Sequence, residues 1–249
     1  MHPTAMQNCQ QFFATYAGAF HDAHTRVIEI GSQDINGSLR ACCPSRFEYC
    51  GVDFVAGKGV DVVLDDPYVL PFDTTSVDIV VTSSCLEHSE MFWVLFLEAM
   101  RILRPHGLLY VNVPSNGEFH RFPVDCWRFY PDSGPALVTW AKRNGLNPAL
   151  LESYTSEQIG DVWNDYVAVF VKDEREAPRH AGRILEGRVD LFNGRLLGTE
   201  GLVNYRFMPE DRRKLDYINR IIANEIALPD DQAKLAFIKR IINNEVKVR

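Results

Sequence analysis

Acidic, glycine and polar side chains recur in the first part of the 249-residue sequence, each placed directly after a short apolar run. Glu29 and Gly31 close the first run, and Asp53 closes the second. Gly31 would let the backbone approach a ligand closely, and the helix expected beyond the turn would offer free N–H groups. A carboxylate at Asp53 can accept hydrogen bonds from both hydroxyls of a ribose. These positions indicate a nucleotide-like ligand, although each one alone is also typical of an ordinary turn.

Two further runs end in groups that could complete the same site. The third run is followed by Asp66, whose carboxylate could accept from an adenine amino group, and then by the apolar residues 70–72. The fourth run ends in the sequence Ser-Ser-Cys-Leu-Glu-His at 83–88. Gln33 stands where the second glycine of a G-x-G-x-x-G motif would be, so a nicotinamide-dependent dehydrogenase is not favoured.

The loop at 114–132 is rich in aromatic and charged residues. It contains His120, Arg121, Asp125, Trp127, Arg128 and Tyr130. Aromatic faces beside arginine and aspartate suit a sugar, or an anion held by arginine. The alternative is that the aromatic residues only pack a lid over the sheet.

Two histidines are candidates for a general base. His120 is close in sequence to Asp125, which could orient its ring. His88 opens the helix expected after the fourth run, where the helix dipole favours a neutral imidazole. Each ring could instead simply hydrogen-bond to the backbone. No set of His, Asp and Glu stands at metal-ligand spacing, so we expect no metal site and no magnesium-dependent mechanism.

The elements that position these groups are short strands alternating with helices. Apolar runs rich in Val and Ile lie at 27–30, 47–52, 60–64, 77–82 and 108–113, with a later one at 163–172. Helical patterns lie at 38–43, 87–103 and 134–144. Runs of this kind suit strands buried on both faces, and their alternation with helices predicts an α/β fold with a doubly wound, mostly parallel sheet. Ligands of such sheets bind beyond the carboxyl ends of the strands.

Composition excludes several classes of protein. The hydrophobic fraction of 46% is typical of a globular chain. The balance of 26 basic against 33 acidic residues (net −7) argues against nucleic acid as the main partner. The six cysteines contain no C-x-x-C pair, which argues against a zinc or disulfide scaffold. With neither a signal peptide nor a membrane span in the pattern, we expect a cytoplasmic protein.

The composition changes near residue 174, which divides the chain into a domain at 1–173 and a helical C-terminal extension at 174–249. Residues 214–226 and 234–246 form a two-copy repeat with helical spacing, separated by a turn at 228–231. Two short amphipathic helices need a larger surface to bury their apolar stripes. That surface is either the domain at 1–173 or another subunit. Because the segment lies beyond the domain, which has its own helices on both faces of the sheet, we favour a helical hairpin that makes a symmetric homodimer.

The ordered set EIGSQDING, GVDF, DDPYVLPF, VDIVVTSSCLEH and ILRPHGLLYVNVPS, over about residues 25–172, resembles the class I S-adenosylmethionine-dependent methyltransferases. The resemblance implies a Rossmann-like sheet of seven strands and S-adenosylmethionine as the cofactor. The cofactor-binding positions that it implies are Glu29, Gly31, Ser32, Gln33, Asp53, Phe54, Asp66, Tyr68, Ser84 and Cys85. Two departures are Gln33, where many members have glycine, and Pro67, which offers no backbone N–H beside the adenine.

The segment HRFPVDCWRFYP also resembles a loop of methyltransferase-like proteins in bacterial surface-polysaccharide and glycan pathways. We therefore expect methylation of a sugar or glycan hydroxyl, with His120 as the base, His88 as the second candidate and Asp125 in support. The expected substrate-binding residues are Arg121, Trp127, Arg128 and Tyr130. The alternatives are methylation of an amine, a carboxylate or a protein side chain, and a non-catalytic scaffold whose C-terminal hairpin binds a partner.

Overall fold

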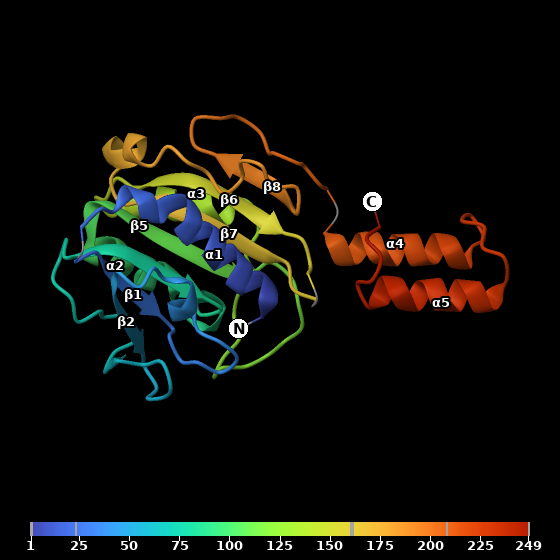
Figure 1. The fold of residues 1–249 in the computed structure, drawn as a ribbon, viewed down its shortest axis with the longest axis horizontal. Helices are drawn as coiled ribbons and strands as arrows, with labels where there is room; N and C mark the ends of the chain where they lie inside the picture. The colour runs from blue at the N-terminus through green and yellow to red at the C-terminus, as the bar shows by residue number, and fades with distance from the viewer. Residues whose placement is uncertain (1, 23, 160–161, 208, 249) are drawn as a thin grey trace.

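The strands of the protein form one eight-stranded sheet in the order β3-β2-β1-β4-β5-β7-β6-β8 (Figure 1). The computed structural model describes residues 2–22, 24–159, 162–207 and 209–248. The strands are β1 (Arg26–Ile30), β2 (Glu48–Asp53), β3 (Val62–Val63), β4 (Val77–Ser83), β5 (Leu103–Pro114), β6 (Ala149–Ser156), β7 (Asp165–Val171) and β8 (Leu191–Leu196). The first five strands run parallel to one another, and β7 and β8 make antiparallel pairs.

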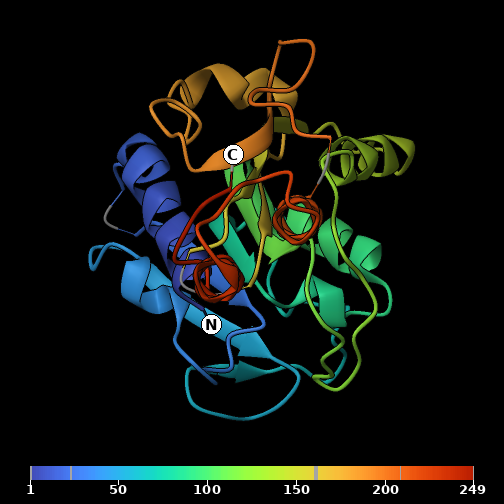
Figure 2. The same ribbon diagram turned by 90° about the vertical axis from the view of Figure 1, so that its right-hand side faces the viewer.

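The predicted doubly wound α/β architecture is confirmed, because helices cover both faces of the sheet. Figure 2 shows α1 (Pro3–Tyr16) on one side and α2 (Phe92–Ile102) and α3 (Ser133–Arg143) on the other. Successive residues of a strand point to opposite faces. Val27 of β1 accordingly packs in the cluster that contains α1, whereas the next residue, Ile28, packs in the cluster that contains α2.

The prediction of seven strands is wrong, since the sheet is mixed and has eight. The additional strand, β8, pairs antiparallel with β6 at the edge of the sheet. Its sequence LFNGRL contains Asn193 at positive φ followed by Gly194, and both residue types are depleted in strands. β8 lies within 174–249, the range assigned to the helical extension, so part of that range belongs to the sheet.

Short 3₁₀ helices complete the connections, and two predicted boundaries differ from the structure. These helices are η1 (Ala17–Ala19), η2 (Leu39–Cys42), η3 (Leu86–His88) and η4 (Glu174–Arg179). The helix expected at 87–103 is divided into η3 and α2. Residues 105–107, expected as a turn before β5, lie inside that strand, at an irregularity opposite Asp78. Asp78 accepts hydrogen bonds there from the backbone of Arg26 and the side chain of Arg104.

The C-terminal repeat forms two antiparallel helices, α4 (Glu210–Ile222) and α5 (Asp231–Ile242), which project from one end of the molecule (Figure 1). The two copies contact each other reciprocally: Lys214 donates to Asn244, and Lys234 donates to Asn224. Ile221 and Ile241, which are equivalent positions of the repeat, are completely buried. The predicted helical hairpin is therefore confirmed.

The hairpin is attached next to the C-terminal ends of β5 and β6. The Glu210 carboxylate accepts hydrogen bonds from the Gln158 backbone (3.1 Å) and the Asn164 side chain (2.9 Å). Asp211 accepts from Asn116 (2.7 Å) in the loop after β5. These carboxylates also lie in the first turn of α4, where the helix dipole favours negative charge. Within the described residues, no helix combines the length and the apolar character that crossing a bilayer requires.

Candidate active site

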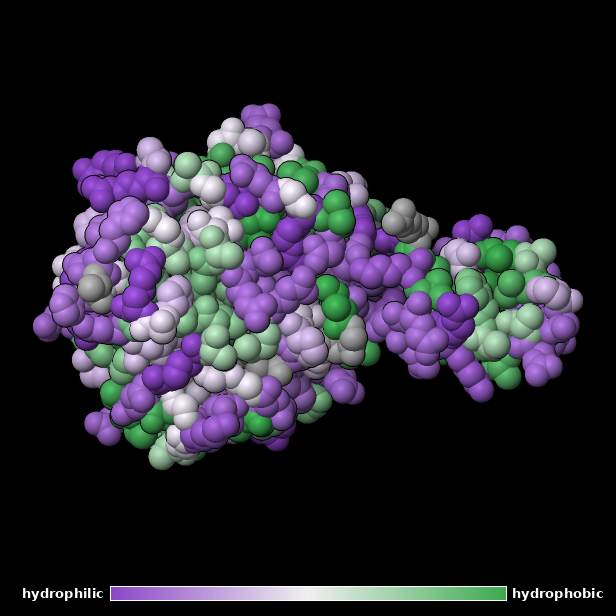
Figure 3. All heavy atoms as spheres, viewed as in Figure 1, coloured by the Kyte–Doolittle hydropathy of each residue, from purple (hydrophilic) through white to green (hydrophobic). Residues whose placement is uncertain are grey.

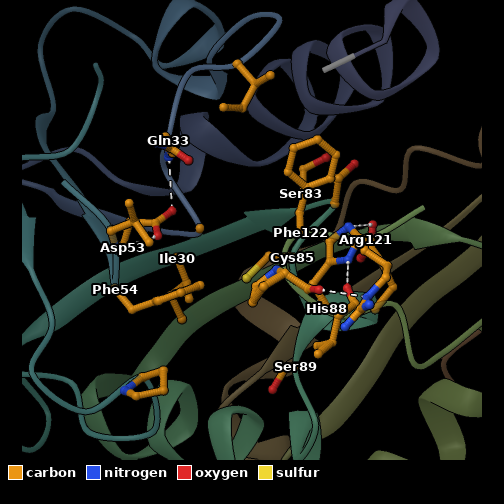
Figure 4. A pocket seen from close by; sticks show the side chains of 18 of the residues that line it. Ile30, Gln33, Asp53, Phe54, Ser83, Cys85, His88, Ser89, Arg121 and Phe122 are labelled. Carbon is orange, nitrogen blue, oxygen red and sulfur yellow. Dashed lines mark hydrogen bonds and ion pairs between the residues drawn. The ribbon is translucent and has the colours of Figure 1, made fainter. Parts of the chain in front are cut away.

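A cavity of about 790 Å³ opens where β1, β2, β4 and β5 end. Of the residues predicted to form a site, those that line it are Gly31, Gln33, Asp53, Phe54, Tyr68, Ser84, Cys85, His88, His120 and Arg121. We call the part formed by Gly31, Gln33, Asp53 and Phe54 the glycine end, and the part formed by His88, His120 and Arg121 the histidine end. Figure 4 shows Asp53 and Phe54 on one side, His88 and Arg121 on the other, and Cys85 between them.

Gly31 is required by the close approach of the β1 and β4 ends. Its φ of +78° is in the left-handed region that favours glycine, and a Cβ atom there would lie 2.6 Å from Cβ of Cys85. Its backbone N–H and that of Ser32 both donate to the carbonyl of Val52 in β2. The turn after β1 is therefore held against the end of β2, and Gly31 packs directly on Cys85.

Asp53 is held in place by the backbone on both sides of the cavity mouth. Its Oδ2 accepts from the Gln33 N–H (3.2 Å), and its Oδ1 accepts from the Val55 N–H (3.1 Å). Gln33 contributes through its backbone, while its side chain lies so close to Gly57 that a Cβ there would be 2.7 Å from the amide nitrogen. Glutamine at this position is thus compatible with the geometry, because the main chain makes the contact with Asp53.

Three of the predicted cofactor-binding residues do not line the cavity. Glu29 is buried beneath it and accepts a hydrogen bond from the Tyr49 hydroxyl (2.8 Å). Ser32 is also buried. Asp66 is exposed and accepts from the Tyr68 N–H (2.8 Å), so it shapes the loop in which Pro67 and Tyr68 reach the cavity.

At the histidine end, both imidazole rings are oriented by backbone carbonyls. Nδ1 of His88 lies 2.6 Å from the Val124 carbonyl, and Nδ1 of His120 lies 3.1 Å from the Glu118 carbonyl. A carbonyl can only accept, so each Nδ1 carries the proton and each Nε2 is left as an acceptor when the ring is neutral. The ring centroids are 4.9 Å apart. Burial lowers the pKa of His88, which favours its neutral form.

The loop after β5 is fixed to the end of β4 by main-chain and carboxylate contacts. The carbonyl of Glu87 accepts from the N–H groups of Cys126 (2.8 Å) and Trp127 (3.3 Å). The buried Asp125 carboxylate accepts from the His120 N–H (2.8 Å) and from Arg128 (2.6 Å). The Arg128 guanidinium lowers the pKa of Asp125 to about 2. Asp125 therefore supports His120 chiefly by holding its backbone, although its Oδ2 is also 3.5 Å from His120 Nδ1.

Three residues expected to bind the substrate lie outside the cavity. Trp127 packs against Phe92 and Trp93 and donates its indole N–H to the Ser89 carbonyl (2.8 Å). Arg128 is engaged by Asp125, and Tyr130 is exposed beyond the loop. Trp127 thus packs the loop onto α2, which was the alternative that its sequence left open.

The cavity wall also contains residues that the sequence patterns did not single out, among them Glu87, Phe122 and Trp163. Glu87 is 1% exposed, and its Oε2 has no hydrogen-bond partner within the described residues. Burial raises the pKa of Glu87 to about 8. Only the position of Glu87 beside His88 was visible in the sequence, because its burial depends on the loop that folds over it.

Comparisons with known proteins agree with this fold. Residues 17–111, which include β1 to most of β5, match the family described as "Methyltransferase domain". No curated protein matches the sequence. The match supports S-adenosylmethionine as the cofactor and a Rossmann-like methyltransferase fold, as the resemblance implied.

Two solved structures illustrate the likeness of the fold. One is the 1,6-didemethyltoxoflavin-N1-methyltransferase of Burkholderia thailandensis, solved with 1,6-didemethyltoxoflavin and S-adenosylhomocysteine bound. It is 14% identical in sequence and has a TM-score of 0.51, and the alignment covers 68% of this chain and 79% of that one. The other is the YcgJ protein of Bacillus subtilis, which is 13% identical, with a TM-score of 0.50 over 70% of this chain and 100% of that one. At these identities the likeness shows the fold alone.

The buried Glu29 makes stability depend on pH. Burial raises its pKa to about 7 from an ordinary value of 4.5, so its stabilising neutral form is fully present below 4.5 and is lost as the pH rises through 7. We expect Glu29→Gln to remove this loss, worth up to about 3 kcal/mol at pH 8. Urea unfolding at pH 4 and pH 8 checks it, with the exposed Glu186→Gln as control. An equal effect of Glu29→Gln at both pH values contradicts the prediction.

Proposed function

We propose that this protein is an S-adenosylmethionine-dependent methyltransferase that methylates a hydroxyl group of a small polar molecule. The observation that carries the proposal is that one cavity joins the glycine end, suited to a nucleoside, to the histidine end, suited to accept a proton. The second resemblance noted in the sequence makes a sugar or glycan the first acceptor class to test.

The glycine end suits the cofactor in three respects. The Asp53 carboxylate, fixed by two N–H groups, can accept from the ribose hydroxyls. The half-exposed ring of Phe54 and the Pro67–Tyr68 loop offer apolar surface for the adenine. Gly31 and Cys85 both line the cavity, and the backbone of Gly31, which carries no side chain, would let the methionine part approach closely. The S-adenosylhomocysteine bound by the Burkholderia thailandensis neighbour supports a cofactor of this chemistry.

The histidine end suits the methyl acceptor. In the transfer, the acceptor oxygen forms a bond to the methyl carbon as the carbon–sulfur bond breaks, S-adenosylhomocysteine leaves, and the hydroxyl proton passes to a base. We propose Nε2 of His120 as that base, with His88 as the alternative, since both rings present an unprotonated Nε2. Arg121 and the exposed ring of Phe122 would position the acceptor, the ring by contact with C–H groups of a sugar.

The hairpin supports a further proposal, a homodimer formed through α4 and α5. Ile221 and Ile241 are completely buried in the hairpin, but Ile222 and Ile242 are 63% and 59% exposed. Figure 3 shows hydrophobic residues gathered on the projecting hairpin. In a symmetric dimer, this surface would be buried against the same surface of a second copy.

We also propose a cytoplasmic location, with which the six free cysteines agree.

Cofactor binding distinguishes Asp53 from Asp66. Asp53→Ala should weaken binding of S-adenosylhomocysteine by about 1–3 kcal/mol, because charge-assisted hydrogen bonds to the ribose are lost. Asp66→Ala, at a residue outside the cavity wall, should cost less. Titration calorimetry measures both variants beside the unmodified protein. Absence of binding by the unmodified protein would refute the methyltransferase proposal. Equal losses of binding free energy in the two variants would show that Asp66 also contacts the cofactor.

Measurements of kcat and KM test the roles proposed for His120 and Arg121 at the histidine end. His120→Ala should lower kcat by about a hundredfold or more, with cofactor affinity unchanged, if the ring is the base. Arg121→Ala should raise KM for the acceptor, whereas Tyr130→Ala, outside the cavity, should do neither. Transfer of a labelled methyl group to a panel of sugars, phenols, amines and carboxylic acids, followed by product mass, supplies the assay. An unchanged rate for His120→Ala would move the role of base to His88.

The dimer is tested by placing charged side chains at the exposed positions 222 and 242 of the hairpin. Ile222→Lys combined with Ile242→Lys should convert a dimer into a monomer, because charged side chains would have to be buried at the interface. Ala236→Lys adds a lysine at an exposed position of α5 and serves as the control. Light scattering gives the mass of each protein in solution. A monomeric unmodified protein at high micromolar concentration is the result that refutes the dimer.

A further inference from the structure

Three potential metal ligands meet at the histidine end. Glu87, His88 and His120 each offer one ligand atom, and these atoms all lie within 4.8 Å of one another. Glu87 and His88 belong to η3 after β4, and His120 belongs to the loop after β5. Sequence spacing could not reveal the set, because it is completed by the backbone hydrogen bonds that join this loop to Glu87.

We propose that Glu87, His88 and His120 form a binding site for one divalent first-row transition metal ion, of the zinc type, in the wall of the cavity. Two imidazoles and one carboxylate are donors that zinc and its neighbours accept, whereas magnesium and calcium prefer oxygen ligands alone. Binding of the ion is independent of the proposed methyl transfer. Only its use in activating the acceptor rests on that function.

The two histidines are oriented as metal-binding histidines usually are. A ligating imidazole normally donates its second ring N–H to a carboxylate or a carbonyl, which fixes the ring and the tautomer. Here the carbonyl of Val124 holds His88, and the carbonyl of Glu118 holds His120. Asp125 stands 3.5 Å from the same nitrogen of His120. Each Nε2 is therefore available as the ligand atom.

Glu87 supplies the independent observation. Its side chain is almost completely buried and lines the cavity, yet Oε2 has no hydrogen-bond partner within the described residues. The neighbouring cation, Arg128, donates to both oxygens of Asp125 instead. A buried carboxyl oxygen without a hydrogen-bond partner is costly, and a metal ion bound in place of the carboxyl proton would satisfy it.

The three ligand atoms lie within 4.8 Å of one another and must come closer together to hold one ion. Oε1 of Glu87, the second oxygen of the same carboxyl group, lies 3.7 Å from Nε2 of His88. Ligand atoms about 2.1 Å from a tetrahedral zinc ion are roughly 3.4 Å apart. Three protein ligands leave a fourth position open toward the cavity, as in catalytic zinc sites. With the ion bound, an acceptor hydroxyl at that position would lose its proton more readily, and the proton would pass to solvent. Without the ion, Nε2 of His120 is free to act as the base.

The test is equilibrium zinc binding by the full-length protein after treatment with a chelator. Competition with a chromophoric chelator should show one Zn²⁺ per chain, with no displacement by excess Mg²⁺. His88→Ala and His120→Ala should each weaken the affinity by at least about 100-fold, and Asp125→Asn by about tenfold. His24→Ala, at an exposed histidine that contacts Glu48, should leave it unchanged. Absence of stoichiometric zinc, or equal affinity in all these variants, overturns the proposal.

Two measurements keep the result interpretable. Co²⁺ bound to the unmodified protein should show bands of nitrogen and oxygen ligation, and a thiolate charge-transfer band would assign the metal to the cysteines and overturn the proposal without any variant. S-adenosylhomocysteine binding is measured separately on the metal-free protein. Cofactor binding without zinc binding overturns the metal site alone, and zinc binding without cofactor binding overturns the methyltransferase proposal alone.

Discussion

The carbonyl oxygen of Glu87 accepts two backbone N–H groups, those of Cys126 and Trp127, and the histidine end of the cavity depends on this contact. It joins the end of β4 to a loop that leaves the sheet after β5. Without it, His88 would have no Val124 carbonyl to orient its ring. This pair of hydrogen bonds therefore brings the two histidines together beside Glu87, whose side chain is buried.

The glycine end depends on a different constraint, the shortage of space between neighbouring strand ends. Gly31 meets Cys85 so closely that any side chain would collide, and the turn after β1 is bonded to Val52 of β2. Asp53 is then fixed by the N–H groups of Gln33 and Val55. Backbone groups thus hold this end together, around the one carboxylate of Asp53. The histidine end is built from side chains, and it is the part that would contact the proposed acceptor.

This difference explains what the sequence could predict. Gly31 and Asp53 act where their strands end, so local patterns located them and the parallel strands that carry them. β6 was missed because its polar residues, such as Glu152 and Ser153, are all buried and hide the apolar pattern of a strand. Trp127 was placed in the cavity on residue type, but contact with Phe92 and Trp93 turns it toward α2. The role of Glu87 depends on a loop more than thirty residues away, which no local pattern encodes.

The attachment of the hairpin reaches the same histidine end. Asp211 of α4 accepts from Asn116, the residue before Gly117. Gly117 lies so close to the Trp163 ring that a Cβ there would be 1.8 Å from it, and the Trp163 ring is 5.0 Å from that of His120. The contacts of Asn116, Gly117 and Trp163 thus lie between α4 and His120. The hairpin and the cavity both lie at the C-terminal ends of the parallel strands. Association through α4 and α5 would therefore occur next to the proposed acceptor site.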